Sequence, residues 1–127
     1  MAKPILPRPT ESELAILRVL WLRGPSTVRQ VQEELGEETG YTTALKLLQI
    51  MTEKKLVTRN ESERTHVYQA RLPEEETQKQ LVSDLLHRAF SGSAKKLVMQ
   101  ALATKKASRT ELAEIRKLID EIEGGSR

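Results

Sequence analysis

The chain has 127 residues, enough for one domain, or for a small domain with an appendage, and for a modest hydrophobic core. Charged residues make up 31% and aromatic residues only 3%, which favours a helical protein with much solvated surface over an aromatic-rich β-sandwich. The net charge of +3 permits an anionic partner without requiring one, and the absence of cysteine excludes disulfides, thiolate metal sites and redox switching through sulfur.

The N-terminal segment predicts an extended arm followed by a helix. Three prolines within residues 1–9 disfavour regular structure there. Thr10 and Glu13 then form a T-x-x-E capping box, in which hydroxyl and carboxylate each accept from a free backbone N–H. Gly24-Pro25 ends this helix. Its apolar positions, including a tryptophan that we interpret as a core anchor, are Leu14, Leu17, Leu20 and Trp21.

Two further helices follow at short intervals. Thr27 and Gln30 make a second capping box, which opens a short helix that ends at Gly36. After a polar turn, a third helix is predicted from Gly40 to about Lys55. Three short helices in succession, the second and third joined by a glycine-bounded turn, are typical of a helix-turn-helix, in which the last helix reads DNA.

The third helix has an apolar face and a polar face. At about 100° per residue, the positions expected to face a core are Ala44, Leu47, Leu48 and Met51. Thr42, Lys46 and Gln49 lie roughly opposite, and Thr43 and Ile50 lie on one flank. Small hydroxyls, an amide and an amine near a helix N-terminus can reach base edges and phosphates. The polar face of a lone amphipathic helix is more often only a solvent-exposed surface than a DNA-reading one. The elements before and after this helix therefore determine which interpretation holds.

A change of period after the third helix predicts a β-hairpin. β-Branched residues are frequent in two segments, residues 56–60 and 65–70. The polar tip between them lacks the Asn-Gly of a tight turn. Three helices and a hairpin, or wing, make a winged-helix domain, in which Arg64 and Arg59 would hold the DNA backbone beside the third helix. The alternative for Arg64 is a solvated charge paired with Glu61 or Glu63.

Residues 73–127 predict three helices with an apolar seam. Leu72-Pro73 marks the boundary between the winged-helix domain of residues 1–72 and this segment. Three such helices have little to bury against within one chain, so we expect a second copy to cover them; packing against the winged helix is the alternative. The expected dimer interface, whose last four positions follow coiled-coil spacing, consists of Leu81, Leu85, Phe90, Leu97, Leu112, Ile115, Ile119 and Ile122.

No catalytic, metal, cofactor or membrane function is expected. The sequence lacks a Gly-rich phosphate loop, a G-x-S-x-G elbow, a close acid pair in an apolar setting and a thiol. Its two histidines, His66 and His87, lie far apart and without metal-ligand spacing. No apolar run approaches membrane-spanning length, and the proline-rich start does not resemble a signal peptide. We therefore expect a cytoplasmic protein that is not an enzyme and does not insert into a membrane.

Several motifs occur in a familiar order along nearly the whole chain. They are Glu13-Leu14, Trp21, Val31-Gln32-Glu33-Glu34-Leu35, Tyr41-Thr42-Thr43, Leu48, Glu53-Lys54 and Arg64-Thr65-His66-Val67-Tyr68. As a set they resemble the penicillinase-repressor family, the BlaI/MecI/CopY transcriptional regulators. The resemblance implies a homodimeric winged-helix repressor that binds an inverted repeat in double-stranded DNA, often with TACA/TGTA-type half-sites.

The resemblance also implies roles for individual residues. The positions that match the family's reading residues and its wing arginine are Thr42, Thr43, Lys46 and Arg64. Ile50 stands where many members have arginine, so the operator preference is expected to depart from that of relatives there. Lys55 replaces the glycine that commonly ends the third helix, which is tolerable if the backbone is not left-handed there.

Two switching mechanisms known in the family bear on this sequence. In the antibiotic-resistance repressors, a membrane sensor-protease triggers cleavage of an Asn-Phe bond in the middle C-terminal helix. The corresponding bond here is Gln100-Ala101, which lacks the bulky aromatic residue. In the copper-responsive branch, C-terminal Cys-x-Cys motifs bind metal, and the absence of cysteine excludes that route.

The sequence therefore predicts a dimeric, sequence-specific repressor of a palindromic operator. Gln49 is expected to add an adenine or phosphate contact to those already named. The alternative is a winged-helix protein-interaction module that binds no DNA. Acidic residues near the second and third helices keep that alternative open: Glu33, Glu34, Glu37, Glu38 and Glu53.

Overall fold

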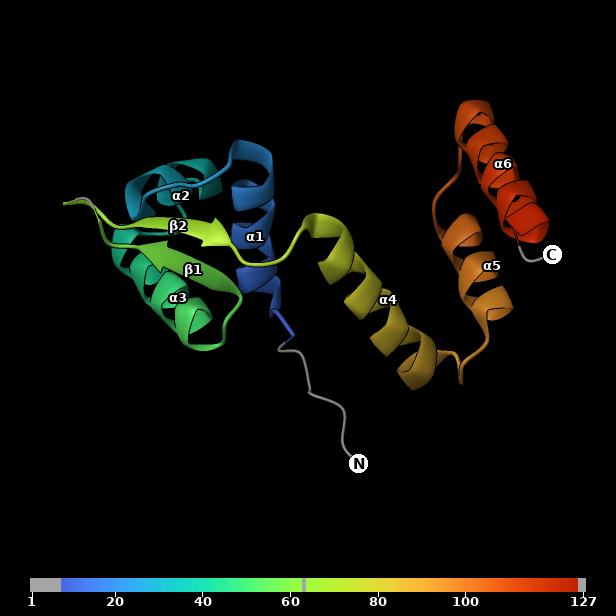
Figure 1. Cartoon of the computed structure of the whole chain (residues 1–127), viewed down its shortest axis with the longest axis horizontal. Helices are drawn as coiled ribbons and strands as arrows, with labels where there is room; N and C mark the ends of the chain where they lie inside the picture. The colour runs from blue at the N-terminus through green and yellow to red at the C-terminus, as the bar shows by residue number, and fades with distance from the viewer. Residues whose placement is uncertain (1–7, 63, 126–127) are drawn as a thin grey trace. The chain divides into compact units, whose positions relative to one another are not determined.

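The computed structural model describes residues 8–62 and 64–125 (Figure 1). In this part of the chain, three helices precede a two-stranded antiparallel hairpin and three helices follow it. The predicted fold, mainly α with a small β-hairpin, is confirmed. Most of the predicted arm, residues 1–7, lies outside the described residues. The chain divides into two compact units, the first ending at Ser83 and the second beginning at Asp84.

The elements lie close to their predicted positions. The first unit contains α1 (Glu11–Arg23), α2 (Val28–Leu35), α3 (Tyr41–Glu53), β1 (Val57–Asn60), β2 (Val67–Ala70) and the start of α4 (Glu74–Ala89). The second unit contains the end of α4, together with α5 (Ala94–Thr104) and α6 (Arg109–Gly125).

Both predicted capping boxes at the start of the chain are present. The Thr10 side chain accepts from the Glu13 N–H at 3.2 Å, and the Glu13 carboxylate accepts from the Thr10 N–H at 2.9 Å. Thr27 and Gln30 make the same pair of bonds at the start of α2. Gly24 ends α1 with φ 91°, a backbone region that favours glycine. These local signals fix where the helices of the first unit begin and end.

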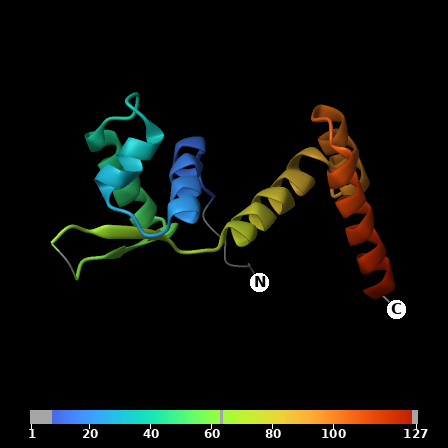
Figure 2. The same ribbon diagram turned by 90° about the horizontal axis from the view of Figure 1, so that it is seen from above.

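Helices α1 to α3 pack on one side of the hairpin (Figure 2). Strands β1 and β2 pair in the register Val57↔Ala70 to Asn60↔Val67. Ser26, just before α2, exchanges two backbone hydrogen bonds with Tyr68, which fastens the start of α2 to β2. The core of this unit consists of Ile16, Leu17, Leu20, Val28, Val31, Ala44, Leu48, Met51, Leu56, Val57 and Tyr68.

Two long-range polar contacts close this unit. The Lys54 amine, which follows α3, donates to the buried Glu13 carboxylate of α1 at 2.7 Å. The Trp21 indole N–H donates to the Leu72 carbonyl oxygen at 3.0 Å. Trp21 is half-buried against the core, so the predicted anchor also fastens the segment that leads into α4.

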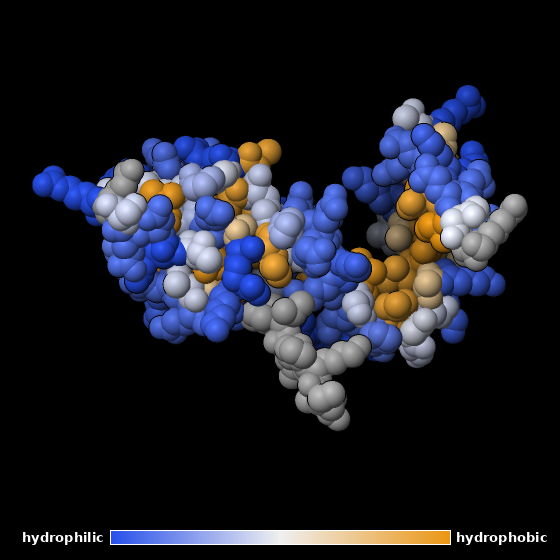
Figure 3. Space-filling view, in the orientation of Figure 1, coloured by the Kyte–Doolittle hydropathy of each residue, from blue (hydrophilic) through white to orange (hydrophobic). Residues whose placement is uncertain are grey.

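The C-terminal helices bury almost nothing within one copy of the chain. No described residue beyond Thr77 is buried. Figure 3 shows apolar residues, in orange, gathered on the visible face of the C-terminal unit. Every expected dimer-interface residue is at least partly exposed, and Leu85, Ile119 and Ile122 are 48%, 50% and 62% exposed. The other large apolar residues exposed in these helices are Val82, Val98, Met99, Leu102 and Leu118.

Candidate nucleic-acid interface

The polar face of α3 is open to solvent. Ala44, Leu48 and Met51 are fully buried and fix the rotation of the helix about its axis. Consequently the five residues predicted to read DNA are all exposed: Thr42, Thr43, Lys46, Gln49 and Ile50. The structure thus brings them onto one helix surface, with Ile50 as an apolar member that is 37% exposed.

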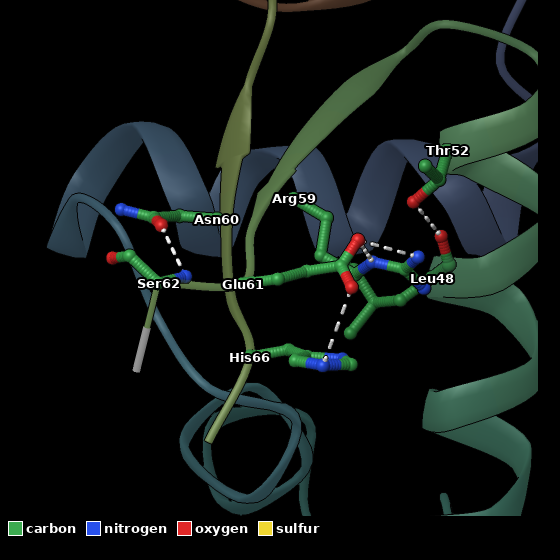
Figure 4. A network of polar contacts seen from close by, with 7 residues as sticks. All are labelled: Leu48, Thr52, Arg59, Asn60, Glu61, Ser62 and His66. Atoms are coloured by element: carbon green, nitrogen blue, oxygen red, sulfur yellow. Dashed lines mark hydrogen bonds and ion pairs between the residues drawn. The ribbon is translucent and has the colours of Figure 1, made fainter. Parts of the chain in front are cut away.

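The hairpin turn carries a polar network (Figure 4). Nε and Nη2 of Arg59 both donate to Oε2 of Glu61, at 3.1 and 2.8 Å. The same carboxylate lies 3.8 Å from Nε2 of His66, so it stands between the two side chains. The hydrogen bond to Glu61, with a further one to Tyr68, raises the pKa of Arg59 above its usual value. Asn60 accepts from the Ser62 N–H at 2.9 Å, which shapes the turn.

Arg64 lies exposed beyond this network. The sequence left open a pairing of Arg64 with Glu61, but Glu61 is engaged by Arg59 and His66 instead. The other candidate partner, Glu63, lies outside the described residues. Within residues 8–62 and 64–125, the Arg64 side chain makes no hydrogen bond or ion pair. Of the two predicted wing arginines, Arg59 is therefore paired, and Arg64 has no partner among the described residues.

A cavity of about 570 Å³ lies between the start of α2, the start of α3 and the hairpin. The start of α2 contributes Thr27, Val28 and Arg29, and α3 contributes Tyr41 and Leu45. The hairpin contributes Arg64, Thr65, His66 and the buried Tyr68 of β2. The Arg29 guanidinium lies over the Tyr41 ring, 5.6 Å from its centroid. Among the described residues, this lining includes two arginines and a histidine and no carboxylate.

Sequence reasoning missed Arg29 and Tyr41 as site residues. The two belong to different helices, and only the folded chain brings them together. A signal was present, however: each stands within two residues of a predicted helix start, where N–H groups without helical acceptors favour anions. The exposed row of α3, the exposed Arg64 and this cavity together form a surface suited to a polyanion with readable edges.

The bond that corresponds to the family's cleavage site lies inside a helix. Gln100 and Ala101 are both exposed within α5, and the Gln100 carbonyl oxygen accepts from the Thr104 hydroxyl at 2.6 Å. Among the helices that the structure describes, none combines the length and the apolar character needed to cross a bilayer.

Comparison with known proteins identifies relatives over most of the chain. Residues 9–121 match the model of a family described as the penicillinase repressor. Two curated relatives, each named transcriptional regulator BlaI, come from Mycobacterium tuberculosis strains CDC 1551 / Oshkosh and ATCC 25618 / H37Rv. Each is 30% identical over 128 residues, an alignment that spans 98% of this chain and 91% of the relative.

Proposed function

This chain belongs to the penicillinase repressor family, and on that basis we propose that it is a transcriptional repressor that binds a palindromic operator as a homodimer. Most of the family match falls on the elements described above, from α1 into α6. The family's description and the relatives' names both refer to control of transcription.

The observation that carries the DNA-binding part is the exposed row of α3. Thr43, Lys46 and Ile50 follow one another at helical spacing, and Thr42 and Gln49 flank them. Side chains of this size can enter the major groove and reach base edges from a helix. Arg64, exposed on the hairpin, would hold the backbone beside that groove.

The apolar surface of the C-terminal helices supports the proposed dimer. Among the described residues after Thr77, none is buried within one copy, and many large apolar side chains are exposed. Exposed apolar side chains of this kind are expected where two copies meet. Two-fold symmetry would present two α3 helices about 34 Å apart, or at a multiple of that distance, to the half-sites of an inverted repeat. Separating the copies would relieve repression because it removes the avidity of two linked sites.

We propose that the protein releases the operator when the dimer separates. A cut at Gln100-Ala101, triggered by a membrane sensor-protease, would separate α6 from the rest of the chain. Because the bond lies within α5, the helix must open locally before a protease can bind it in extended form.

A selection from random duplexes, followed by a salt titration, tests the proposal. A repressor enriches an inverted repeat, and the logarithm of its affinity falls with the logarithm of salt by about 0.9 per phosphate contact. The alternative, a protein-interaction module, enriches no sequence and shows no binding to random duplex at low salt. Four of the acidic residues that favour this alternative lie in and after the C-terminal half of α2, where Glu34 pairs with Arg23 at 3.0 Å, and the fifth, Glu53, ends α3.

A further inference from the structure

The cavity between α2, α3 and the hairpin contains charged groups that the reading of bases does not use. We propose that it binds one phosphate of the DNA backbone in each half-site, with Arg29 and Arg64 as donors and Tyr41 as the surface that orients Arg29. This inference rests on the proposed DNA-binding function and names a contact within it.

Arg29 is held in place without losing its charge. A guanidinium stacked over an aromatic ring is restrained in position and tilt, while the N–H groups at its edge stay free to donate. No other hydrogen bond or ion pair of the Arg29 side chain is present within the described residues. The planar guanidinium matches two oxygens of one phosphate, which makes Arg29 a preorganised donor.

Glu61, an acidic residue beside the cavity-lining His66, is already engaged. Glu61 accepts two hydrogen bonds from Arg59 and lies 3.8 Å from His66, which lines the cavity. The Arg59 charge therefore compensates Glu61, and Arg64 faces the cavity without a partner among the described residues. Among the described residues, the arrangement leaves a net positive lining where α2, α3 and the hairpin meet.

The backbone at the start of α2 adds neutral donors. The Thr27 hydroxyl accepts from the Gln30 N–H, so the capping box satisfies that donor. The N–H groups of Val28 and Arg29, the first two helical residues, have no acceptor within the helix. Both residues line the cavity, as does Thr65 from the hairpin turn. Two guanidinium groups, free amides and a hydroxyl form a donor set for a tetrahedral oxyanion.

The position of the cavity favours a backbone phosphate over a free anion. Tyr41 and Leu45 of α3 line it, and Thr42 and Lys46 of the same helix are exposed next to them in sequence. A duplex read by that face brings its own phosphates to both sides of the groove. A phosphate fixed in the cavity would set the depth and register of α3 along the operator.

The experiment uses the full chain and the duplex enriched by selection. Arg29→Ala is expected to weaken binding about tenfold per half-site, on selected and random duplex alike. It should also reduce the salt slope by about 0.9 per half-site. Tyr41→Phe, which keeps the ring, should bind as the wild type does, whereas Tyr41→Leu should resemble Arg29→Ala. Arg18→Ala, an exposed arginine of α1 outside the cavity, serves as the control and should change neither quantity.

A scan with single neutral methylphosphonates identifies the phosphate itself. The wild type should lose affinity at one position per half-site, and Arg29→Ala should show no further loss there. If the penalty persists unchanged in the variant, or if the variant keeps the wild-type salt slope, the assignment is wrong. Inorganic phosphate that shifts the Tyr41 ring signals in NMR spectra, without any such position in the scan, would assign the cavity to a free anion instead. Failure of the wild type to enrich any duplex would contradict the proposed function itself.

Discussion

Lys46 is the exposed cation in the middle of the α3 surface. Replacing it with alanine should weaken operator binding by about 1–3 kcal/mol per half-site if its amine contacts a base. A phosphate contact would instead weaken all duplexes equally and lower the salt slope. Fluorescence anisotropy on selected and scrambled duplexes separates these cases, with Lys79→Ala, an exposed lysine of α4, as the control. Unchanged affinity for the selected duplex would remove Lys46 from the interface.

Ile50 is an exposed apolar side chain on an otherwise polar surface. In the major groove the group that suits it is the 5-methyl of thymine. We expect replacement of one operator thymine by uracil to weaken wild-type binding by about 0.8 kcal/mol, roughly fourfold. The Ile50→Ala variant should bind the two duplexes equally. If no thymine shows this dependence on Ile50, the residue does not contribute to specificity.

Lys55 has φ 64°, in the left-handed region of the backbone map. Lysine in place of glycine was expected to be tolerable here only if the backbone were not left-handed, and that condition is not met. Lys55→Gly should therefore stabilise the fold by about 0.5–1 kcal/mol, because glycine adopts this conformation without strain. The hydrogen bond from Arg71 Nε to the Lys55 carbonyl oxygen, at 2.7 Å, involves backbone and is kept. Urea unfolding measures the change. Lys55→Ala keeps the strained backbone and should give no gain; an equal gain would point to another cause.

Contacts made by single side chains divide into those that the sequence reveals and those that it does not. The exposure of Lys46 was predictable because helical periodicity determines which face is apolar. The stacking of Arg29 on Tyr41 was not, since no pattern within either helix specifies how the two helices pack. The partner of Glu61 was also missed: Arg59, two residues before it, occupies the carboxylate that was considered for Arg64.

Among the elements, α1 depends on a buried carboxylate. Burial raises the pKa of Glu13, but hydrogen bonds from Lys54 and Thr10 and the charge of Lys54 outweigh it, so the pKa lies below its ordinary value. A lowered folded-state pKa means that this stability is present above the unfolded pKa and is lost as the pH falls through the folded value. Urea unfolding at about pH 7 and about pH 3 should therefore show a loss at low pH.

The Lys54→Met variant tests the source of that pH dependence. It leaves Glu13 buried without its cation, so it should be less stable than the wild type at neutral pH by about 1–3 kcal/mol. Protonation of Glu13 would then stabilise the fold of the variant instead of destabilising it. The loss of stability between neutral and low pH should therefore be smaller than in the wild type. Glu11→Gln, an exposed residue in the same first turn, should keep the wild-type pH profile. An undiminished loss in Lys54→Met would assign it to other groups.

Most element boundaries could be predicted because their signals are local. Capping residues and left-handed glycines act over a few positions, and both capping boxes and Gly24 lie where the sequence placed them. The bonds from Lys54 to Glu13 and from Trp21 to Leu72 join residues far apart in sequence. Such contacts depend on how elements pack, which no short motif specifies.

At the scale of the whole molecule, the C-terminal apolar face should decide the oligomeric state. Replacing Ile115 and Ile119 with glutamate should yield a monomer in light scattering, because two charges cannot be buried without partners. Lys117→Glu changes the net charge by the same amount on the opposite side of α6 and should stay dimeric. A double variant that remains dimeric would place the interface elsewhere.

No residue that the structure describes beyond Thr77 is buried, and this also affects how much protein a cell needs. Helices without a tertiary core are only marginally stable in water. In the proposed dimer the C-terminal helices would therefore become well ordered mainly when two copies associate. At low abundance the pool of paired molecules then grows as the square of the copy number. Repression would consequently begin over a narrow range of protein concentration. A modest fall in synthesis could relieve repression while the DNA-reading surface stays intact.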